Sequence, residues 1–173
     1  MDANKVYGYL VVSRGRLLDA IRKLTPEQYG RSFPIGLGSI ASTLTHIMIS
    51  EWYYVERLDG REVPPYSEWP IQYEHPPAFS VVEAEWQAQV ARTRRSIEAQ
   101  KDWNRDFTYR SFPDEAGKQY DIAASAGDMF TQLALHEVHH RAQIMVMMRQ
   151  LGDSATPIED IDYNALMFRR TAI

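Results

Sequence analysis

Apolar residues recur at helical spacing through most of this chain and predict four long helices. The stripes cover about residues 3–24, 40–58, 81–103 and 126–151. Within each stripe the apolar side chains return every three or four positions, which places them on one face of a helix. Four helices of this length with little strand between them indicate an all-α protein built as a four-helix bundle. A short fifth helix is predicted at about 160–170.

Capping residues mark where these helices begin and end. The predicted starts are Thr25 with Pro26 for a short turn after the first helix, Ser39, Ser80 with Glu83, and Ser125 with Asp128. Serine and threonine at these positions accept hydrogen bonds from the first free backbone N–H groups, and an acidic residue three positions later completes a capping box. Gly152 supplies the stop after the last long helix.

The connections on either side of the third helix differ in character. Residues 59–79 hold five of the nine prolines and several aromatic side chains, which predicts a long, stiff loop. This loop is either a packed crossover connection or the lining of a substrate pocket. Residues 107–122 alternate apolar and polar side chains around a turn at 113–117, which predicts a short β-hairpin between the third and fourth long helices.

Length and charge limit the classes of function. The 173 residues suit a single domain spanning 1–173. The absence of cysteine excludes disulfides, zinc–thiolate sites, iron–sulfur clusters and a cysteine nucleophile. A net charge of −4 argues against nucleic acid or an anionic membrane as partner. Since neither a signal peptide nor a membrane-spanning run is evident, we expect a cytoplasmic protein.

Three of the five histidines cluster in the fourth long helix. Its apolar stripe runs Met129, Leu133, His136, His140, Ile144, Met147, Leu151. Four residues apart, His136 and His140 lie about 40° from each other around the axis and one turn apart, so their imidazoles converge. Because two buried imidazoles need polar partners, the pair predicts a divalent metal site. His139 lies off this stripe and is interpreted as a surface or supporting group.

The remaining histidines are less clear from periodicity. His46 lies in the second long helix, about 120° from the centre of its apolar stripe, so the pattern leaves it either a ligand or a surface residue. His75 lies in the proline-rich loop, where no helical spacing places it near the other candidate metal ligands. The string from His136 to His140 also matches H-E-x-x-H, in which Glu137 would be the general base of a zinc peptidase. The lack of a substantial β-sheet argues against that class.

Two segments resemble signatures of the DinB/YfiT-like superfamily. One runs from Leu135 through His136-Glu137-Val138-His139-His140 to Ile144, and the other covers Leu44 to Tyr53 and ends at Leu58-Asp59-Gly60. The resemblance implies a four-helix bundle of up-down-down-up topology and a divalent metal held by His46, His136 and His140. The presence of Ala142, where the family often has glycine, is a departure that still permits close helix packing.

The resemblance also implies a range of activities, because the superfamily includes metal-dependent thiol transferases and isomerases. Our first expectation is an enzyme that acts on a small-molecule substrate with a low-molecular-weight thiol supplied from outside, with Glu137 and His139 orienting the ligands. A hydrolase using metal-activated water and a non-catalytic, metal-stabilised bundle are the alternatives. Three imidazoles favour zinc or nickel, with iron, manganese or copper also compatible. The largely apolar second helix suggests a homodimer.

Overall fold

The computed structural model describes residues 2–114, 116–152, 158 and 161–169. Within them lie four long helices: α1 (Ala3–Ile21), α3 (Ile40–Leu58), α4 (Phe79–Ala99) and α5 (Ala126–Gln150). The shorter elements are α2 (Pro26–Gly30), the 3-10 helix η1 (Tyr66–Glu68), α6 (Tyr163–Met167), β1 (Asp106–Arg110) and β2 (Asp121–Ser125). The predominantly helical fold is therefore confirmed.

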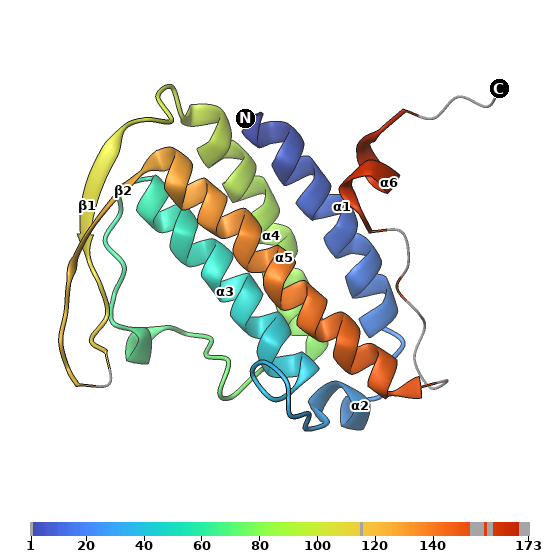
Figure 1. Ribbon diagram of the computed structural model, residues 1–173. Helices are drawn as coiled ribbons and strands as arrows, with labels where there is room; N and C mark the ends of the chain where they lie inside the picture. Colours follow the sequence, from blue (N-terminus) through green and yellow to red (C-terminus); the bar gives the residue numbers. More distant parts are fainter. Residues whose placement is uncertain (1, 115, 153–157, 159–160, 170–173) are drawn as a thin grey trace.

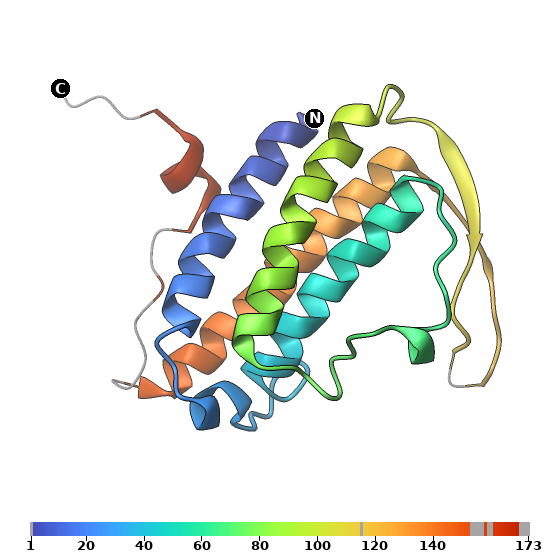
Figure 2. The ribbon, with the colours of Figure 1, turned by 180° about the vertical axis from the view of Figure 1, so that it is seen from behind.

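The four long helices pack side by side around a shared core (Figure 1). Helix α3 contacts both α5 and α4, and α1 closes the arrangement against α4 and α5. Seen from both sides, α3 and α4 run in one direction and α1 and α5 in the other (Figures 1 and 2). Helix α3 also contacts α2, so this largely apolar helix has neighbours on several sides.

The core is layered along the bundle axis. One apolar cluster includes Leu17, Leu44 and Ile144, and a second includes Leu10, Val55 and Leu133. On each of these three helices, a charged residue lies between the two clusters and is buried. These residues are Arg14 on α1, Glu51 on α3 and Glu137 on α5. The bundle therefore contains a polar layer enclosed between two apolar ones.

The predicted boundaries hold best where a side chain caps the helix. Ser39 caps α3, and Ser125 with Asp128 forms the predicted capping box of α5. Thr25 caps α2, and Gly152 has a positive φ of 64° just beyond α5. The α6 segment falls inside the predicted 160–170 range, of which 160 and 170 lie outside the described residues.

The predicted capping box at Ser80 and Glu83 is wrong. Helix α4 begins at Phe79 after Ala78, which makes no side-chain cap. The backbone N–H groups of Val81 and Val82 both donate to the carbonyl of Ala78, so Ser80 already lies inside the first turn. The carboxylate of Glu83 instead pairs with Arg22. Helix α4 also ends at Ala99 and α1 at Ile21, several residues before the predicted ends.

The two predicted connections are confirmed. Strands β1 and β2 pair antiparallel with Asp106 opposite Ser125 and Arg110 opposite Asp121, as a hairpin that projects beside the bundle (Figure 1). Residues 59–78 form the long connection from α3 to α4 and contain only η1 as a regular element. Among the described helices none has both the length and the apolar character required to cross a bilayer.

Candidate metal centre

Three imidazoles from two adjacent helices meet on one side of the bundle. His46 comes from α3, and His136 and His140 come from successive turns of α5. One ring nitrogen from each lies within 4.8 Å of those from the other two, and Nε2 of His46 is 2.9 Å from Nε2 of His136. All three side chains are half-buried. The structure thus brings together the three histidines singled out in the sequence, including His46, which periodicity left undecided.

A glutamine fixes the orientation of one of these imidazoles. Nδ1 of His140 lies 2.8 Å from Oε1 of Gln143, and since an amide oxygen can only accept, Nδ1 carries the proton. Nε2 of His140 is then the nitrogen with a free lone pair. Gln143 in turn donates from Nε2 to Nε2 of His139 at 3.0 Å. His139 therefore acts on the cluster through Gln143, which refines its predicted supporting role.

The loop before α3 packs tightly against this glutamine. Gly36 has a φ of 54°, in the left-handed region that glycine tolerates best. A Cβ atom at this position would lie 2.5 Å from Oε1 of Gln143, the atom that accepts the hydrogen bond from Nδ1 of His140. The lack of a side chain at Gly36 thus leaves room for the Gln143–His140 hydrogen bond.

The surroundings keep all three imidazoles uncharged at neutral pH. Burial, with the neighbouring His140, lowers the pKa of His46 to about 4. Burial and the other histidines lower the pKa of His136 to about 3. Burial and His139 also lower the pKa of His140, against the opposing hydrogen bond to Gln143. Because only a neutral imidazole can bind a metal, the cluster has the protonation state that a metal site requires.

Aromatic rings from two directions border the cluster. Tyr73, in the long connection, lies edge-on to His46 with ring centroids 5.1 Å apart. Tyr54, on α3, lies edge-on to His136 with centroids 5.6 Å apart. Tyr73 is itself joined to Tyr66, whose hydroxyl accepts a hydrogen bond from the backbone N–H of Tyr73. The proline-rich connection therefore forms one wall beside the histidines.

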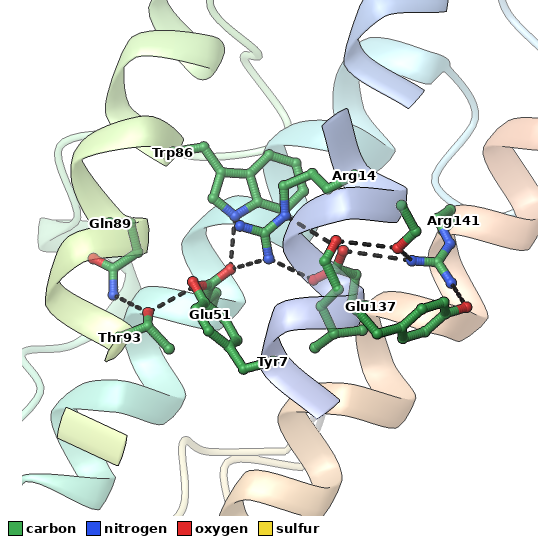
Figure 3. A network of polar contacts seen from close by, with 11 residues as sticks. Tyr7, Arg14, Glu51, Trp86, Gln89, Thr93, Glu137 and Arg141 are labelled. Atoms are coloured by element: carbon green, nitrogen blue, oxygen red, sulfur yellow. Dashed lines mark hydrogen bonds and ion pairs between the residues drawn. The ribbon is translucent and has the colours of Figure 1, made fainter. Parts of the chain in front are cut away.

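A separate polar network fills the interior of the bundle (Figure 3). Glu51 accepts hydrogen bonds from Tyr7 at 2.6 Å, Thr93 at 2.7 Å and Trp86 at 2.7 Å. Its carboxylate also pairs with Arg14 at 2.6 Å. Arg14 stacks over the indole of Trp86, with its guanidinium carbon 4.2 Å from the ring centroid. Every long helix contributes to this network.

The same arginine joins Glu51 to Glu137. Nη2 of Arg14 lies 2.6 Å from Oε2 of Glu137, and Nη1 of Arg141 lies 3.7 Å from its other oxygen. Arg141 also donates to Ser13, and to the hydroxyl of Tyr9 at 2.6 Å. Two arginines thus balance two glutamates, which satisfies charges that would otherwise be costly to bury.

The position of Glu137 corrects two predictions. Its carboxylate is held in the interior by Arg14 and Arg141, and no hydrogen bond joins it to a described imidazole. It therefore does not orient the histidine ligands, and it is not placed to act as the base of an H-E-x-x-H peptidase. The reason is the direction in which these side chains leave the helix. On α5, Glu137 and Arg141 face the centre of the core, while His136 and His140 lie on an adjacent, less buried face.

Arg14 and Glu51 were not identified from the sequence as members of this network, although the apolar stripes of α1 and α3 contain a pattern that indicates them. The stripe of α1 contains a gap of seven between Leu10 and Leu17, and Arg14 occupies its middle. Glu51 similarly continues the apolar spacing of α3 at Ile47 and Val55. A charged residue inside an apolar stripe predicts a buried, paired charge. His75, by contrast, is exposed in the long connection and lies outside the histidine cluster.

The donor set suits a divalent transition metal. Imidazole nitrogen binds zinc, nickel, copper and iron, and three protein ligands leave coordination positions open for another molecule. The close approach of Nε2 of His46 and Nε2 of His136 is unfavourable if both carry lone pairs, and a shared cation removes that repulsion. His46, His136 and His140 therefore form a group that could hold a metal ion.

Comparison with known proteins identifies the family. No curated protein matches the chain. The chain does match the DinB family over residues 1–168, a range that includes all three histidines of the cluster and all four long helices. The chain belongs to the DinB family.

Proposed function

We propose that His46, His136 and His140 hold a divalent metal and that the protein is a metal-dependent enzyme. The observation that carries this proposal is the convergence of three uncharged imidazoles within 4.8 Å, from two helices whose relative position the buried network fixes. When bound by three imidazoles, such an ion supplies Lewis acidity and lowers the pKa of a thiol or water that occupies an open position. Zinc or nickel is our first expectation for its identity.

The surrounding residues have separate roles in this proposal. Gln143 holds the proton of His140 on Nδ1 and so presents Nε2 to the cluster. Tyr73 and Tyr54 cover the flanks of His46 and His136 and restrict the access of water. Arg14 joins Glu51 of α3 to Glu137 of α5, which keeps the two ligand-bearing helices in register.

We propose further that the reaction is the transfer of an external low-molecular-weight thiol to an electrophilic small molecule. The chain contains no cysteine, so a reacting thiol must come from solution. Zinc held by imidazoles also accepts thiolate sulfur as a further ligand, and the aromatic rings that border the site suit an apolar electrophile. In such a transfer the thiol sulfur bonds to the electrophilic carbon, the leaving group departs with its electron pair, and the thiol proton passes to solvent.

Turnover by metal-loaded protein tests this proposal. Protein loaded with zinc or with nickel is incubated with glutathione, cysteine or dithiothreitol and 1-chloro-2,4-dinitrobenzene, and thioether formation is followed by absorbance. We expect metal-dependent turnover in the wild type, loss of turnover in His46→Ala, and retention in His75→Ala. Inactivity of the fully loaded wild type with every thiol, tested with several electrophiles, would contradict a thiol transferase.

The same preparations separate the alternatives. Hydrolysis of an activated ester without thiol would identify a hydrolase, in which Glu137 would not be the base because its carboxylate is ion-paired in the interior. A large rise in melting temperature on metal addition, with no turnover of any substrate, would identify a metal-stabilised bundle without catalysis.

A further inference from the structure

A cavity lies in the groove between α3 and α4, apart from the histidines. It has a volume of about 410 Å³ and lies against residues 69–71 of the long connection. Its apolar wall is formed by Met48, Ile49 and Trp52 of α3 together with Trp69 and Ile71. No member of the histidine cluster lines it. A cavity of this size can hold a small organic molecule.

Two tryptophans make part of this wall aromatic. The rings of Trp52 and Trp69 meet edge-on with centroids 4.9 Å apart. The indole N–H of Trp69 already donates to the carbonyl of Pro64 at 3.0 Å, which fixes the ring in place. The wall therefore offers a preformed surface on which a planar apolar group can pack.

The opposite rim of the cavity is formed by α4 and carries positive charge. Arg92 and Arg95 both line the cavity. Arg92 is paired with Glu56 of α3, whereas Arg95 has no ion pair with any residue that the structure describes. Glu85 is the acidic residue on this rim, and it precedes Arg95 by ten positions, or about 15 Å along the helix axis. Arg95 therefore remains available to an anion.

The positive rim extends beyond this cavity. Arg92 and Arg95 also line an adjoining hollow of about 790 Å³ near the C-terminal ends of α3 and α4. Three more cations, Arg61, Lys101 and Arg105, line that hollow against two carboxylates, Asp59 and Asp102. Burial and the charge of Arg95 lower the pKa of Arg92, in keeping with an excess of positive charge here. An anionic group at this rim would reduce that repulsion.

We propose that the groove between α3 and α4 binds a small organic anion with a planar apolar body. The body packs against Trp52 and Trp69, and the carboxylate, sulfonate or phosphate group pairs with Arg95. The proposal is independent of the metal, because the groove shares no lining residue with the histidine cluster.

Two dyes with the same aromatic body test the proposal. 8-Anilino-1-naphthalenesulfonate carries an anionic group, and N-phenyl-1-naphthylamine is its neutral counterpart. Binding of each is measured by fluorescence titration, after circular dichroism melting has shown that every variant is folded. We expect the wild type to bind both dyes, with the sulfonate bound more tightly.

Variants on α4 then separate charge from shape. Arg95→Gln should weaken the sulfonate about two- to fivefold, the loss expected for one exposed ion pair, and leave the neutral dye unchanged. Arg94→Gln removes the same charge from a residue that does not line the groove, and it should behave as wild type. Ala88→Trp should fill the cavity and weaken both dyes. His46→Ala should bind both dyes as wild type does, which keeps this test separate from the metal site.

Several outcomes would overturn the proposal. The first is failure of the wild type to bind the sulfonate. The second is an equal effect of Arg95→Gln and Arg94→Gln, which would show only a general dependence on surface charge. The third is binding of both dyes to Ala88→Trp with unchanged affinity, which would place them elsewhere on the molecule.

Discussion

The two carboxylates of the buried network and the three imidazoles of the histidine cluster come from the same two helices, α3 and α5, but their surroundings differ. Glu51 and Glu137 are buried and surrounded by hydrogen-bond donors, from Arg14, Tyr7, Trp86 and Thr93. His46 and His136 are half-buried, and their Nε2 atoms face each other at 2.9 Å. In the first region the buried carboxylates are paired within the protein, whereas the second is a group of imidazoles that could hold a metal ion. The network thus serves the scaffold, and the cluster is the candidate binding site.

The carboxylates of the network and the imidazoles of the cluster lie close together in the sequence. His46 precedes Glu51 by five residues on α3, and His136 is the immediate neighbour of Glu137 on α5. Each helix thus presents one face to the interior, with a carboxylate, and an adjacent face to the cluster, with an imidazole. The network should therefore determine how the three histidines are positioned. Substitutions in the network should disturb the histidine cluster, whereas substitutions of the histidines should leave the network intact.

The largest effect is expected from breaking the network. Glu51→Ala removes the partner of Arg14, Tyr7, Thr93 and Trp86 at once and leaves buried donors without an acceptor. Breaking a buried pair in this way costs about 3–5 kcal/mol of unfolding free energy. Urea unfolding followed by circular dichroism measures this loss. Arg110→Ala breaks an exposed ion pair with Asp121 and should change the unfolding midpoint little; equal losses in the two variants would contradict a structural role for the network.

A smaller effect is expected at the glutamine that orients His140. Gln143→Leu removes the acceptor for the Nδ1 proton, so the ring is free to turn and to change tautomer. Loss of such a supporting partner typically weakens metal binding about 10–100-fold. Competition with a chromophoric chelator measures the affinity. His139→Ala is the matched control, because it removes only the hydrogen-bond partner of the Gln143 amide nitrogen. Its metal affinity should lie within a few-fold of the wild-type value.

Substitution of Gly36 should have a similar but weaker consequence. A Cβ atom here would meet Oε1 of Gln143 at 2.5 Å, and the φ of 54° disfavours any L side chain. We therefore expect Gly36→Ala to lower both the metal affinity and the stability, by less than Gln143→Leu lowers the affinity. Gly38, at a φ of 84° but with open space around it, provides a control in Gly38→Ala, which should lower the stability and leave the affinity unchanged.

The stability of the metal-free protein should also depend on pH. Because the pKa of His46 falls to about 4 and that of His136 to about 3, the folded state binds fewer protons than the unfolded state below the ordinary histidine pKa of about 6.5. Stability should therefore be complete above about pH 6.5 and decline as the pH falls toward 4. Urea titrations across this range should show a shallower decline in His46→Ala. Identical slopes in the two proteins would show that His46 is not shielded from protonation.

The sequence predicted the scaffold better than the site. The helix stripes and the caps at Ser39 and Ser125 depend on local spacing and local hydrogen bonds, and the structure confirms them. At Ser80 the local pattern failed, because Glu83 is engaged by Arg22, a residue 61 positions away. A local sequence motif cannot predict a partner that lies so far away in the sequence.

The histidine cluster shows the same limit. The pairing of His136 with His140 follows from helical spacing alone, but the contribution of His46 depends on how α3 docks against α5. An apolar stripe marks only the centre of the buried face, and His46 lies at its edge, next to the neighbouring helix. The charged residues of the network were missed for a related reason, since Arg14 and Glu51 interrupt apolar stripes and only their mutual pairing makes them interior residues.

Metal content of the purified protein tests the central claim most directly. Wild type, His46→Ala, His140→Ala and His75→Ala are each dialysed against zinc or nickel, and the bound metal is measured by elemental analysis, with folding checked by circular dichroism. The account predicts about one ion per chain in the wild type and in His75→Ala, and loss of that ion in both cluster variants. A folded His46→Ala protein that retains the wild-type metal content would contradict it, because the ion would then be held without the only ligand from α3.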